Sequence, residues 1–530
     1  MAKQTKYLIV TGGVCSGLGK GISAASLGAI VQSMGYSVFP IKLDPYLNVD
    51  PGTMNPFRHG EVFVTDDGAE TDLDLGHYER FLNISLNRFS SVSSGQIYTD
   101  LLAKERRGEY LGRDVQIIPH VTDGIKSRII NAGLQSQADI VTVEIGGTVG
   151  DIEAEPFLEA LRQLAEELGN ENVFFVHVVL VPYLKASKEL KTKPAQASVR
   201  ELRRSGLRPD MIIARADYDL PPSILEKIAF FSSLDPEAVI PAVTASSIYD
   251  VPLEFAHAAE ILVKHFGLVW RQPDLSRWES LRSARTAAVT AKKVAFVAKY
   301  AGFDDAYFSV LEALRAAAWH QGVKVEIVPI DAELLEKEGV QMLAGVDGIL
   351  VPGGYGKRGT EGKILAAHYA REQKIPYLGL CLGMQMMVIE AARNVLGKKD
   401  ATSEEFEPTS PDLVIHLMSA QKDIVDKGGT NRLGLYPCTL TAGTKTAAAY
   451  GKLSIAERHR HRYEFNNHYR KALEDVGMII AGVNTDLDLV EIVEWRDHPF
   501  MIGVQFHPEF LSRPVAPHPL FKSFFHAMFI

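Results

Sequence analysis

Short runs of β-branched and other apolar residues alternate along the whole chain with segments of helical period. In the first half, strands are expected at 8–10, 140–145, 173–181 and 211–214, and helices at 22–34 and 156–168. Nearly continuous apolar strands that alternate with amphipathic helices are typical of a parallel sheet covered on both faces. The alternation begins again near residue 294, with strands expected at 294–299, 324–330, 347–351 and 376–380. We therefore expect an α/β fold with two such sheets.

The length of the chain indicates more than one domain. It has 530 residues, whereas a single hydrophobic core stops growing at roughly 250 to 300 residues. Residues 270–285 are charged, contain tryptophan and follow no strand period, so we place a linker there. We expect domains at 1–267 and 292–530, joined by a linker at 268–291.

Charge and cysteine content restrict the partners and the compartment. The net charge of -9 and the isoelectric point near 6.0 argue against nucleic-acid binding but allow a local pocket for a nucleotide. Three cysteines (Cys15, Cys381 and Cys438) form no disulfide framework, and no export signal is recognised, so we expect a cytoplasmic protein. The longest apolar run, 173–184, is well short of the roughly 20 residues of a membrane helix. We expect no membrane partner.

A glycine-rich turn joins the first predicted strand to the helix at 22–34, with the sequence Gly12-Gly-Val-Cys-Ser-Gly-Leu-Gly-Lys20-Gly21. Glycines let backbone N–H groups close around phosphates, and a lysine can reach the outer phosphates. The turn departs from the standard P-loop because Val14 replaces a glycine and Gly21 replaces a serine or threonine. A plain strand-to-helix turn is the alternative. The coincidence of strand, turn, lysine and helix favours a modified P-loop.

Acidic residues follow that could hold a metal ion beside this loop. Glu144 ends the strand at 140–145, and Asp72 and Asp74 lie within 70–76. Carboxylate oxygens suit Mg²⁺, which bridges the phosphates of ATP. The alternative is helix capping and surface solvation, which the pattern favours narrowly for Asp72 but not for Glu144.

Residues 191–196, Lys-Thr-Lys-Pro-Ala-Gln, place two lysines and a glutamine in a loop with a proline. Alone, this stretch is typical of a solvated charge run. Beside a phosphate loop it indicates a second phosphorylated substrate.

In the second half, Cys381 stands at a sharp predicted turn between a strand and a helix. It is flanked by Gly379 and Gly383, the pattern of a nucleophile elbow. A free thiol holds only a few per cent of its reactive thiolate at neutral pH, so a base is needed. His507 can supply it, and Glu509 can orient the imidazole. A buried core thiol and a surface histidine are the alternatives, but the two patterns together argue against both.

These stretches together resemble the CTP synthase family of glutamine-dependent ligases, over residues 3–525. The resemblance is carried by residues 16–21, 42–53, 59–64, 67–81, 144–153, 191–196, 379–385, 458–464 and 505–510. It implies a dethiobiotin-synthetase-like parallel sheet of P-loop type followed by a class I glutamine amidotransferase domain. It also implies ATP-dependent amination of UTP to CTP through a 4-phosphorylated UTP, with ammonia from L-glutamine or free ammonia. Ammonia would travel through an internal passage beginning near His59.

The resemblance further implies residue roles. Catalysis on glutamine would use Cys381, His507 and Glu509. ATP would be bound by Gly17, Leu18, Gly19, Lys20, Gly21, Ile22, Lys42 and Asp74, with Mg²⁺ on Asp74 and Glu144. UTP or CTP would be bound by Ser16, Asp151, Ile152, Glu153, Lys191, Thr192, Lys193, Pro194, Ala195, Gln196 and Lys227. Glutamine would be bound by Gly354, Leu382, Gly383, Met384, Gln385, Glu405 and Arg462.

Within this glutamine site, Gly353-Gly354 and the Leu382 N–H are expected to form an oxyanion hole. From the basic run 458–462 we favour Arg462 as the clamp of the glutamine carboxylate. The family further implies a homotetramer, CTP as inhibitor and GTP as activator. Bacterial relatives usually carry a lysine where this chain has Phe308, so we expect weaker activation by GTP.

Two alternatives stay open on the residues. A cobyrinate-type amide ligase also joins a modified P-loop domain to a glutaminase-like domain, but its substrate has neither a base nor a triphosphate. The lysine loop at 191–196 and Glu153 indicate a substrate that has both, and so argue against this alternative. A P-loop switch or filament protein with an inactive second domain would not need Cys381, His507 and Glu509 intact.

Overall fold

The computed structural model describes residues 4–418, 421 and 428–529. The chain divides into two compact units: the N-terminal unit (1–50 and 74–282) and the C-terminal unit (51–73 and 283–530). The extreme residues of the predicted domains, 1–3 and 530, lie outside the described residues. Among the helices of the described part, none is long and apolar enough to cross a membrane.

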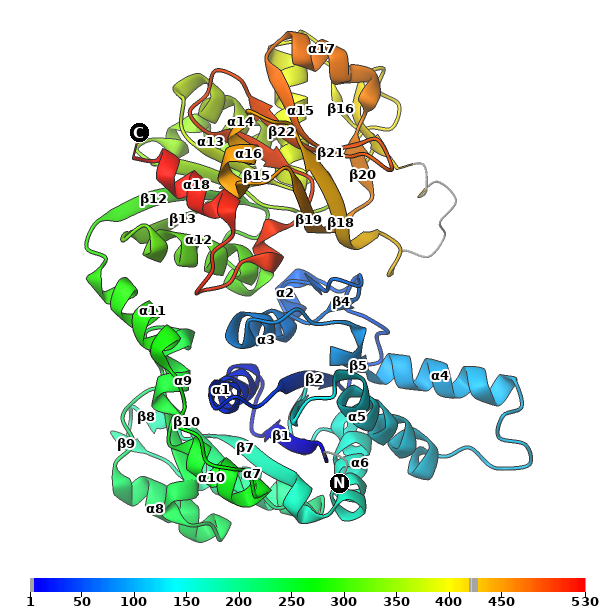
Figure 1. The fold of residues 1–530 in the computed structure, drawn as a ribbon, viewed down its shortest axis with the longest axis vertical. Helices are drawn as coiled ribbons and strands as arrows, with labels where there is room; N and C mark the ends of the chain where they lie inside the picture. Colours follow the sequence, from blue (N-terminus) through cyan, green and yellow to red (C-terminus); the bar gives the residue numbers. More distant parts are fainter. Residues whose placement is uncertain (1–3, 419–420, 422–427, 530) are drawn as a thin grey trace. The chain divides into compact units, whose positions relative to one another are not determined.

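A seven-stranded sheet in the order β11-β10-β7-β1-β6-β2-β5, with all pairs parallel, forms the centre of the N-terminal unit (Figure 1). Its strands are β1 (Lys6–Gly12), β2 (Val38–Asp44), β5 (Ser91–Ser93), β6 (Ile140–Ile145), β7 (Val173–Leu180), β10 (Met211–Ala216) and β11 (Val239–Val243). A small hairpin consists of β8 (Tyr183–Leu184) and β9 (Glu189–Leu190). The helices are α1 (Lys20–Ser33), α3 (Asp74–Leu82), α4 (Ser94–Arg106), α5 (Thr122–Ser136), α6 (Glu155–Leu168), α7 (Lys193–Arg204), α8 (Pro222–Ser232), α9 (Val251–Glu254) and α10 (Ala258–Phe266).

Alternate residues of the central strands face opposite layers of helices. Val143 packs in one core with residues of α5 and α6. The neighbouring Thr142 faces α1, because a Cβ added to Gly28 of that helix would lie 3.6 Å from the threonine Cγ2. The period of two therefore places Glu144 on the α1 side, at the C-terminal end of its strand. Lys42 is its register partner on β2.

The C-terminal unit is built on a nine-stranded sheet in the order β13-β12-β14-β15-β23-β22-β21-β18-β19. Its strands are β12 (Ala291–Ala298), β13 (Lys324–Asp331), β14 (Gly348–Val351), β15 (Tyr377–Leu380), β18 (Arg432–Leu440), β19 (Ser454–His461), β21 (Met478–Asn484), β22 (Leu489–Trp495) and β23 (Met501–Val504). A second sheet holds β16 (Thr402–Ser403), β17 (Leu413–Leu417) and β20 (Tyr463–Phe465). The first five strands in the order pair in parallel, and the others pair antiparallel.

Two hydrophobic cores fill the two faces of this nine-stranded sheet. The helices are α12 (Phe308–His320), α13 (Ala332–Glu338), α14 (Thr360–Gln373), α15 (Leu382–Asn394), α16 (Lys445–Tyr450), α17 (Arg470–Asp475) and α18 (Pro519–Ala527). Residues of α13, α14 and α15 share one core, and residues of α12 and α18 share the other. Figure 1 shows α12 and α18 (red) near each other beside the sheet. The strand β15 lies inside the parallel part, between β14 and β23, and the chain that leaves it enters α15 at the C-terminal edge of the sheet.

Residues 51–73 belong to the C-terminal unit although they are far from it in the sequence. They contain α2 (Pro56–His59), β3 (Phe63–Val64) and β4 (Glu70–Thr71). The Glu61 N–H donates to the Asp305 carbonyl at 2.8 Å. The Phe63 ring contacts the Phe510 ring, with centroids 5.0 Å apart. Backbone and ring contacts thus hold this segment within the unit.

The predicted fold class is confirmed: both halves are α/β, and the first contains an all-parallel sheet. The predicted strands at 140–145 and 324–330 correspond to β6 and β13. Residues 270–285 were expected to be irregular, but Ser276–Ala287 form the helix α11. Trp278 is buried between Phe81 and Tyr249, with centroids 5.4 and 6.1 Å away. Of this helix only Trp278 and Leu281 are buried, and two buried positions leave too weak an apolar period to predict a helix, which explains the difference.

Candidate active sites

The predicted phosphate loop connects the C-terminal end of the central strand β1 to the N-terminus of α1. Gly17 and Gly19 have φ angles of 75° and 85°, which glycine adopts without strain. A Cβ at Gly13 would lie 1.8 Å from Ser198 Oγ in α7, so a side chain there would displace this serine. Val14 also has a positive φ of 80°, a strained conformation for a β-branched residue. The loop is therefore shaped by glycine at defined positions, and it ends at the positive end of the α1 dipole.

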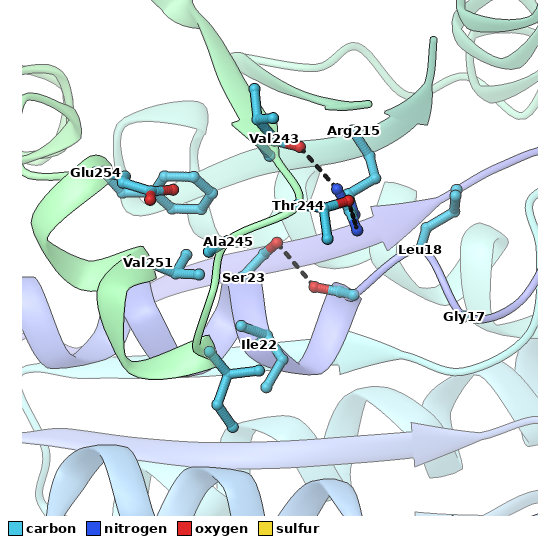
Figure 2. A pocket seen from close by; sticks show the side chains of 14 residues that line it. Gly17, Leu18, Ile22, Ser23, Arg215, Val243, Thr244, Ala245, Val251 and Glu254 are labelled. Carbon is cyan, nitrogen blue, oxygen red and sulfur yellow. Dashed lines mark hydrogen bonds between the residues drawn. The ribbon is translucent and has the colours of Figure 1, made fainter. Parts of the chain in front are cut away.

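A cavity of about 210 Å³ opens beside this loop. It is lined by Gly17, Leu18, Gly19, Ile22, Ser23, Arg215, Ala242, Val243, Thr244, Ala245, Ile248, Val251, Glu254 and Phe255. Figure 2 shows that the lining residues come from the loop before α1 and its first turn, from β10, from the end of β11 and the segment after it, and from α9. Arg215 donates to Thr244 Oγ1 at 2.9 Å. Apolar walls with a few polar groups suit a flat heterocycle.

Two lysines lie among carboxylates on the α1 face of the sheet. Lys20 Nζ donates to the Gly147 carbonyl at 2.6 Å, and burial lowers the pKa of this lysine while Glu144 raises it. Lys42 Nζ contacts the Asp74 carboxylate and lies 3.6 Å from Glu144 Oε1. The structure therefore brings together Lys20, Lys42, Asp74 and Glu144, as predicted.

Glu144 is buried, and its charge state depends on nearby cations. Burial and then the Asp74 carboxylate raise the pKa of Glu144 to about 8, whereas Lys42 lowers it. The Tyr78 hydroxyl donates to this carboxylate. A carboxylate in such surroundings is stabilised by an additional cation.

The donor set fits Mg²⁺. A Cβ on Gly21 would lie 2.1 Å from Asp74 Oδ1 and 3.3 Å from Glu144 Oε2, so both carboxylates reach the space at the start of α1. Among the described residues no group of three or more histidine, cysteine, aspartate or glutamate side chains is arranged to hold a metal. An ion held by two carboxylates takes its other ligands from phosphate oxygens and water, as Mg²⁺ commonly does.

The residues predicted to hold UTP or CTP lie on neighbouring segments of the N-terminal unit. Asp151, Ile152 and Glu153 are exposed after β6. Just before them, a Cβ on Gly150 would lie 3.2 Å from Glu201 Cγ of α7, so this turn packs against that helix. Ser16 is exposed in the loop whose Gly13 also packs against α7.

Residues 191–196 run from β9 into the first turn of α7. Gln196 Nε2 donates to Thr192 Oγ1 at 3.0 Å. Lys227 is exposed on α8, and Lys191 and, less strongly, Lys227 lower the pKa of Glu189. The predicted residues thus lie on segments that pack along α7 or lead into it, and Lys227 lies on the neighbouring helix α8.

Cys381 occupies a strained turn between β15 and α15, with φ 49° and ψ -102°. A Cβ at Gly379 would lie 2.6 Å from the Gly383 carbonyl carbon, and one at Gly383 would lie 2.1 Å from the Val351 oxygen. Glycine is therefore required on both sides of the cysteine. The Cys381 N–H donates to the Val504 carbonyl at 2.7 Å, which fixes the turn against β23. The predicted nucleophile elbow is present.

His507 lies where the predicted base should lie. Its Nδ1 is 2.7 Å from Glu509 Oε1, and its ring stacks on Phe510 with centroids 5.1 Å apart. Burial lowers the pKa of His507, but the Glu509 carboxylate and then Cys381 raise it, to about 10. The imidazole can therefore keep a proton while the sulfur carries a negative charge.

A second side chain reaches the sulfur of Cys381. Gln505 Nε2 donates to Cys381 Sγ at 3.6 Å. Gln505 Oε1 accepts from Gln385 Nε2 at 3.2 Å, and this amide also donates to the Tyr463 carbonyl at 3.1 Å. This chain of amides turns an N–H toward the sulfur. Gln505 was predicted only as part of the stretch 505–510, with no role of its own. Its position two residues before His507 was the signal that could have placed it near the cysteine.

The predicted nucleophile and base open into a second cavity, of about 240 Å³, within the C-terminal unit. It is lined by Gly52, Met54, Pro56, Glu61, Val62, Tyr300, Ala306, Tyr307, Val310, Pro352, Gly353, Gly354, Tyr355, Cys381, Arg460, His507, Glu509 and Phe510. Residues of 51–73 thus contribute part of the wall. Sequence analysis did not place this segment beside the cysteine.

Not all the residues predicted to bind glutamine line this cavity. Gly354 does, while Leu382, Gly383, Met384 and Gln385 form the buried first turn of α15. Glu405 Oε1 accepts from the Gly356 N–H at 2.6 Å. Arg462 donates to Gln421 Oε1 at 2.9 Å and to Thr430 Oγ1 at 2.6 Å. Within the described part of the chain, Glu405 and Arg462 are not among the lining residues.

Arg460, which the prediction passed over in favour of Arg462, does line the cavity. It donates to Glu70 Oε1 at 2.7 Å and to the Gly52 carbonyl at 2.9 Å. Its own carbonyl accepts from the Tyr355 hydroxyl at 2.9 Å. Both arginines belong to the basic run 458–462, so the sequence could not separate them. In the structure β19 ends at His461, and Arg462 follows it in a bend.

Comparison with known proteins matches both halves of the chain to known families. Residues 6–268 match the family model described as CTP synthase N-terminus, and residues 303–527 match the one described as glutamine amidotransferase class-I. A CTP synthase of Carboxydothermus hydrogenoformans is 56% identical over 527 residues, which cover 99% of this chain and 98% of the relative. The chain belongs to the CTP synthase family.

Other members of the CTP synthase family are similarly close. A CTP synthase of Geobacillus kaustophilus is 53% identical over 527 residues, covering 99% of both chains. A solved structure described as the glutaminase domain of Trypanosoma brucei CTPS with bound acivicin is 41% identical and covers 45% of this chain and 93% of that chain, with a TM-score of 0.42. Membership of the CTP synthase family makes the chain a ligase with a glutaminase domain.

Proposed function

We propose that this chain catalyses the ATP-dependent conversion of UTP to CTP, a step of pyrimidine nucleotide biosynthesis, with ammonia taken from L-glutamine or from solution. The observation that carries this proposal is that one chain, similar to CTP synthases over 527 residues, holds both a phosphate loop with adjoining acids and a Cys381-His507-Glu509 set. Neither site alone requires the other. Their presence together fits a ligase that makes its own ammonia.

For the glutaminase step, Cys381 Sγ attacks the side-chain carboxamide carbon of glutamine, and His507 carries the thiol proton. The carbonyl oxygen becomes an oxyanion, which the N–H groups of Gly353 and Leu382 are placed to stabilise. His507 gives its proton to the leaving nitrogen, and ammonia departs. Water, deprotonated by His507, then attacks the thioester and releases glutamate.

For the ligase step, the γ-phosphoryl group of ATP passes to O4 of the uracil ring. Ammonia adds at C4, and phosphate leaves with that oxygen. Lys20 and the N–H groups of residues 17–22 bind the phosphates, Lys42 balances their charge, and the cavity of about 210 Å³ takes the base of ATP. Asp74 and Glu144 would hold Mg²⁺, which offsets the charge of the transferring phosphoryl group.

The similarity to CTP synthases supports the roles of the remaining residues. UTP, or CTP as inhibitor, binds at Ser16, Asp151 to Glu153, Lys191 to Gln196 and Lys227, where cations suit a triphosphate. Glutamine contacts Gly354, the first turn of α15, Glu405 and Arg462.

Residues 1–267 and 292–530 act as synthase and amidotransferase domains, joined by 268–291. GTP activates, four chains assemble, and the enzyme works in the cytoplasm.

The decisive test of this function is direct. The purified chain is incubated with ATP, UTP, Mg²⁺ and glutamine, and formation of CTP is followed by absorbance and chromatography. Omitting each component in turn controls for contaminating activity. Formation of CTP that requires every component supports the proposal. If no CTP forms with glutamine and none forms with ammonium salt, the proposal is refuted.

A further inference from the structure

Lys363 is a lysine without any exposed surface, on the helix α14. Charged side chains are almost never fully buried unless they are paired, because removing them from water is costly. Burial lowers the pKa of Lys363 well below its ordinary value; Lys299 lowers it further, while Cys381 raises it. Its Nζ donates to the Pro352 carbonyl at 2.9 Å. The acceptor is thus a backbone group of the loop that faces Cys381.

The orientation of one peptide follows from this bond. The peptide between Pro352 and Gly353 is trans and planar, so its C=O and N–H point in opposite directions. Lys363 holds the C=O, and the N–H of Gly353 therefore points away from the lysine. Among the described residues this N–H has no hydrogen-bond partner.

Gly353 adjoins the reacting groups. A Cβ on it would lie 2.9 Å from His507 Cε1 and 3.5 Å from Cys381 Cβ. The glycine also lines the cavity into which the cysteine opens. An N–H at this place, together with that of Leu382 at the start of α15, is suited to an oxyanion formed on a carbon bonded to the sulfur.

A second buried lysine holds the next part of the same loop. Lys299 Nζ donates to the Tyr355 carbonyl at 2.6 Å and also to the Gly356 carbonyl. Burial lowers the pKa of Lys299 to about 8. The Gly356 N–H is taken by Glu405 at 2.6 Å. The carbonyls on both sides of the glycine pair therefore accept from buried lysines, and the bond from Lys363 opposes rotation of the Pro352–Gly353 peptide.

We propose that Lys363 is a positioning residue of the glutaminase reaction, which holds the Pro352–Gly353 peptide with its N–H toward Cys381 and so forms the oxyanion hole before glutamine binds. The inference rests on the proposed glutaminase step. A rotated peptide would turn the carbonyl into the cavity, where it would repel the oxyanion. It would also leave the buried amine of Lys363 without its acceptor, which disfavours the rotated form.

The test is Lys363→Met in the full chain, because methionine has a similar length and no N–H. The matched control is Lys374→Met, at the exposed end of the same helix and remote from the loop. We expect kcat for glutamine hydrolysis to fall by at least about tenfold, up to the roughly 100- to 1,000-fold that loss of an oxyanion-hole donor costs, with a nearly unchanged KM. The control should keep both constants.

Two further measurements separate positioning from packing. L-glutamate γ-semialdehyde forms a tetrahedral adduct with a thiol, and its oxygen occupies the oxyanion position. Its inhibition constant should rise in Lys363→Met by the factor by which kcat/KM for glutamine falls. Alkylation of Cys381 by iodoacetamide, followed on its peptide by mass spectrometry, needs no oxyanion hole and should keep its rate.

Unchanged kcat and semialdehyde inhibition in Lys363→Met would overturn the proposal. If Lys363→Met loses both glutamine hydrolysis and alkylation of Cys381, the proposal is also overturned, because the lysine would then only maintain the packing around the cysteine. If Lys363→Met does not fold, Lys363→Gln, which keeps a shorter donor, is judged by the same criteria. A wild-type chain that does not hydrolyse glutamine would instead refute the proposed function.

Discussion

The guanidinium of Arg460 donates to the carboxylate of Glu70 at 2.7 Å, although 390 positions separate the two residues in the chain. Both side chains are largely buried, with 15% and 2% of their surface exposed. The pair ties the hairpin β3–β4 to the strand β19 and to the wall of the cavity at Cys381. Residues 51–73 therefore act as part of the C-terminal unit.

Removing this pair should loosen the segment. In Glu70→Gln, Arg460 stays buried without a carboxylate, a change that costs about 3 to 5 kcal/mol in buried ion pairs. Amide exchange of residues 61–71, measured by mass spectrometry, should become at least about tenfold faster. The control Glu105→Gln breaks a solvent-exposed pair with Arg106 and should not alter this exchange. Equal exchange in both variants would show that the pair does not hold the segment.

The pH dependence of Cys381 reactivity should depend on Glu509. In the wild type burial lowers the pKa of His507, but the Glu509 carboxylate and then Cys381 raise it to about 10, so the imidazolium persists below that pH. In Glu509→Gln this contribution is lost while burial still lowers the pKa of His507, so the imidazole holds the proton that it takes from Cys381 less strongly. Glutamine hydrolysis at pH 8 should fall about a hundredfold or more. A pH–rate profile that overlays the wild-type profile would contradict this assignment.

The phosphate loop can be tested independently of the cysteine. Lys20→Ala should reduce CTP formation about a hundredfold or more with either nitrogen source, because the charge of the transferring phosphoryl group loses its cation. Lys104→Ala, on the exposed part of α4, is the control. Normal ammonia-dependent synthesis in Lys20→Ala would mean that the loop does not hold the transferred phosphate.

Phe308 begins α12, next to Ser309, whose N–H donates to Glu61 Oε2 at 2.8 Å. An aromatic ring offers no charge to a phosphate, so we expect weak activation by GTP. Phe308→Lys should lower the GTP concentration for half-maximal activation about fivefold, the effect of one exposed charge contact. Leu334→Lys, on exposed α13, is the control. Superimposable GTP titrations for wild type and Phe308→Lys would exclude a role of this position.

Much of this arrangement could be predicted because its signals are local. The elbow at Cys381 and the loop before Lys20 each lie on one short stretch between a strand and a helix, where glycine spacing reports backbone geometry. The contribution of 51–73 could not be predicted, since the pair of Glu70 with Arg460 is a long-range contact. Lys363 was missed for a related reason: a lysine in a helical pattern is normally exposed, and it is buried here by the packing of α14 against α13, α15 and the sheet.

The central claim is that one chain carries two separable reactions linked by ammonia, and Cys381→Ala tests it most directly. CTP formation by the variant is measured with glutamine and, separately, with ammonium salt as the nitrogen source. The account predicts that glutamine-dependent synthesis falls at least about a thousandfold, while ammonia-dependent synthesis stays within about twofold of wild type. An equal loss with both nitrogen sources would contradict it.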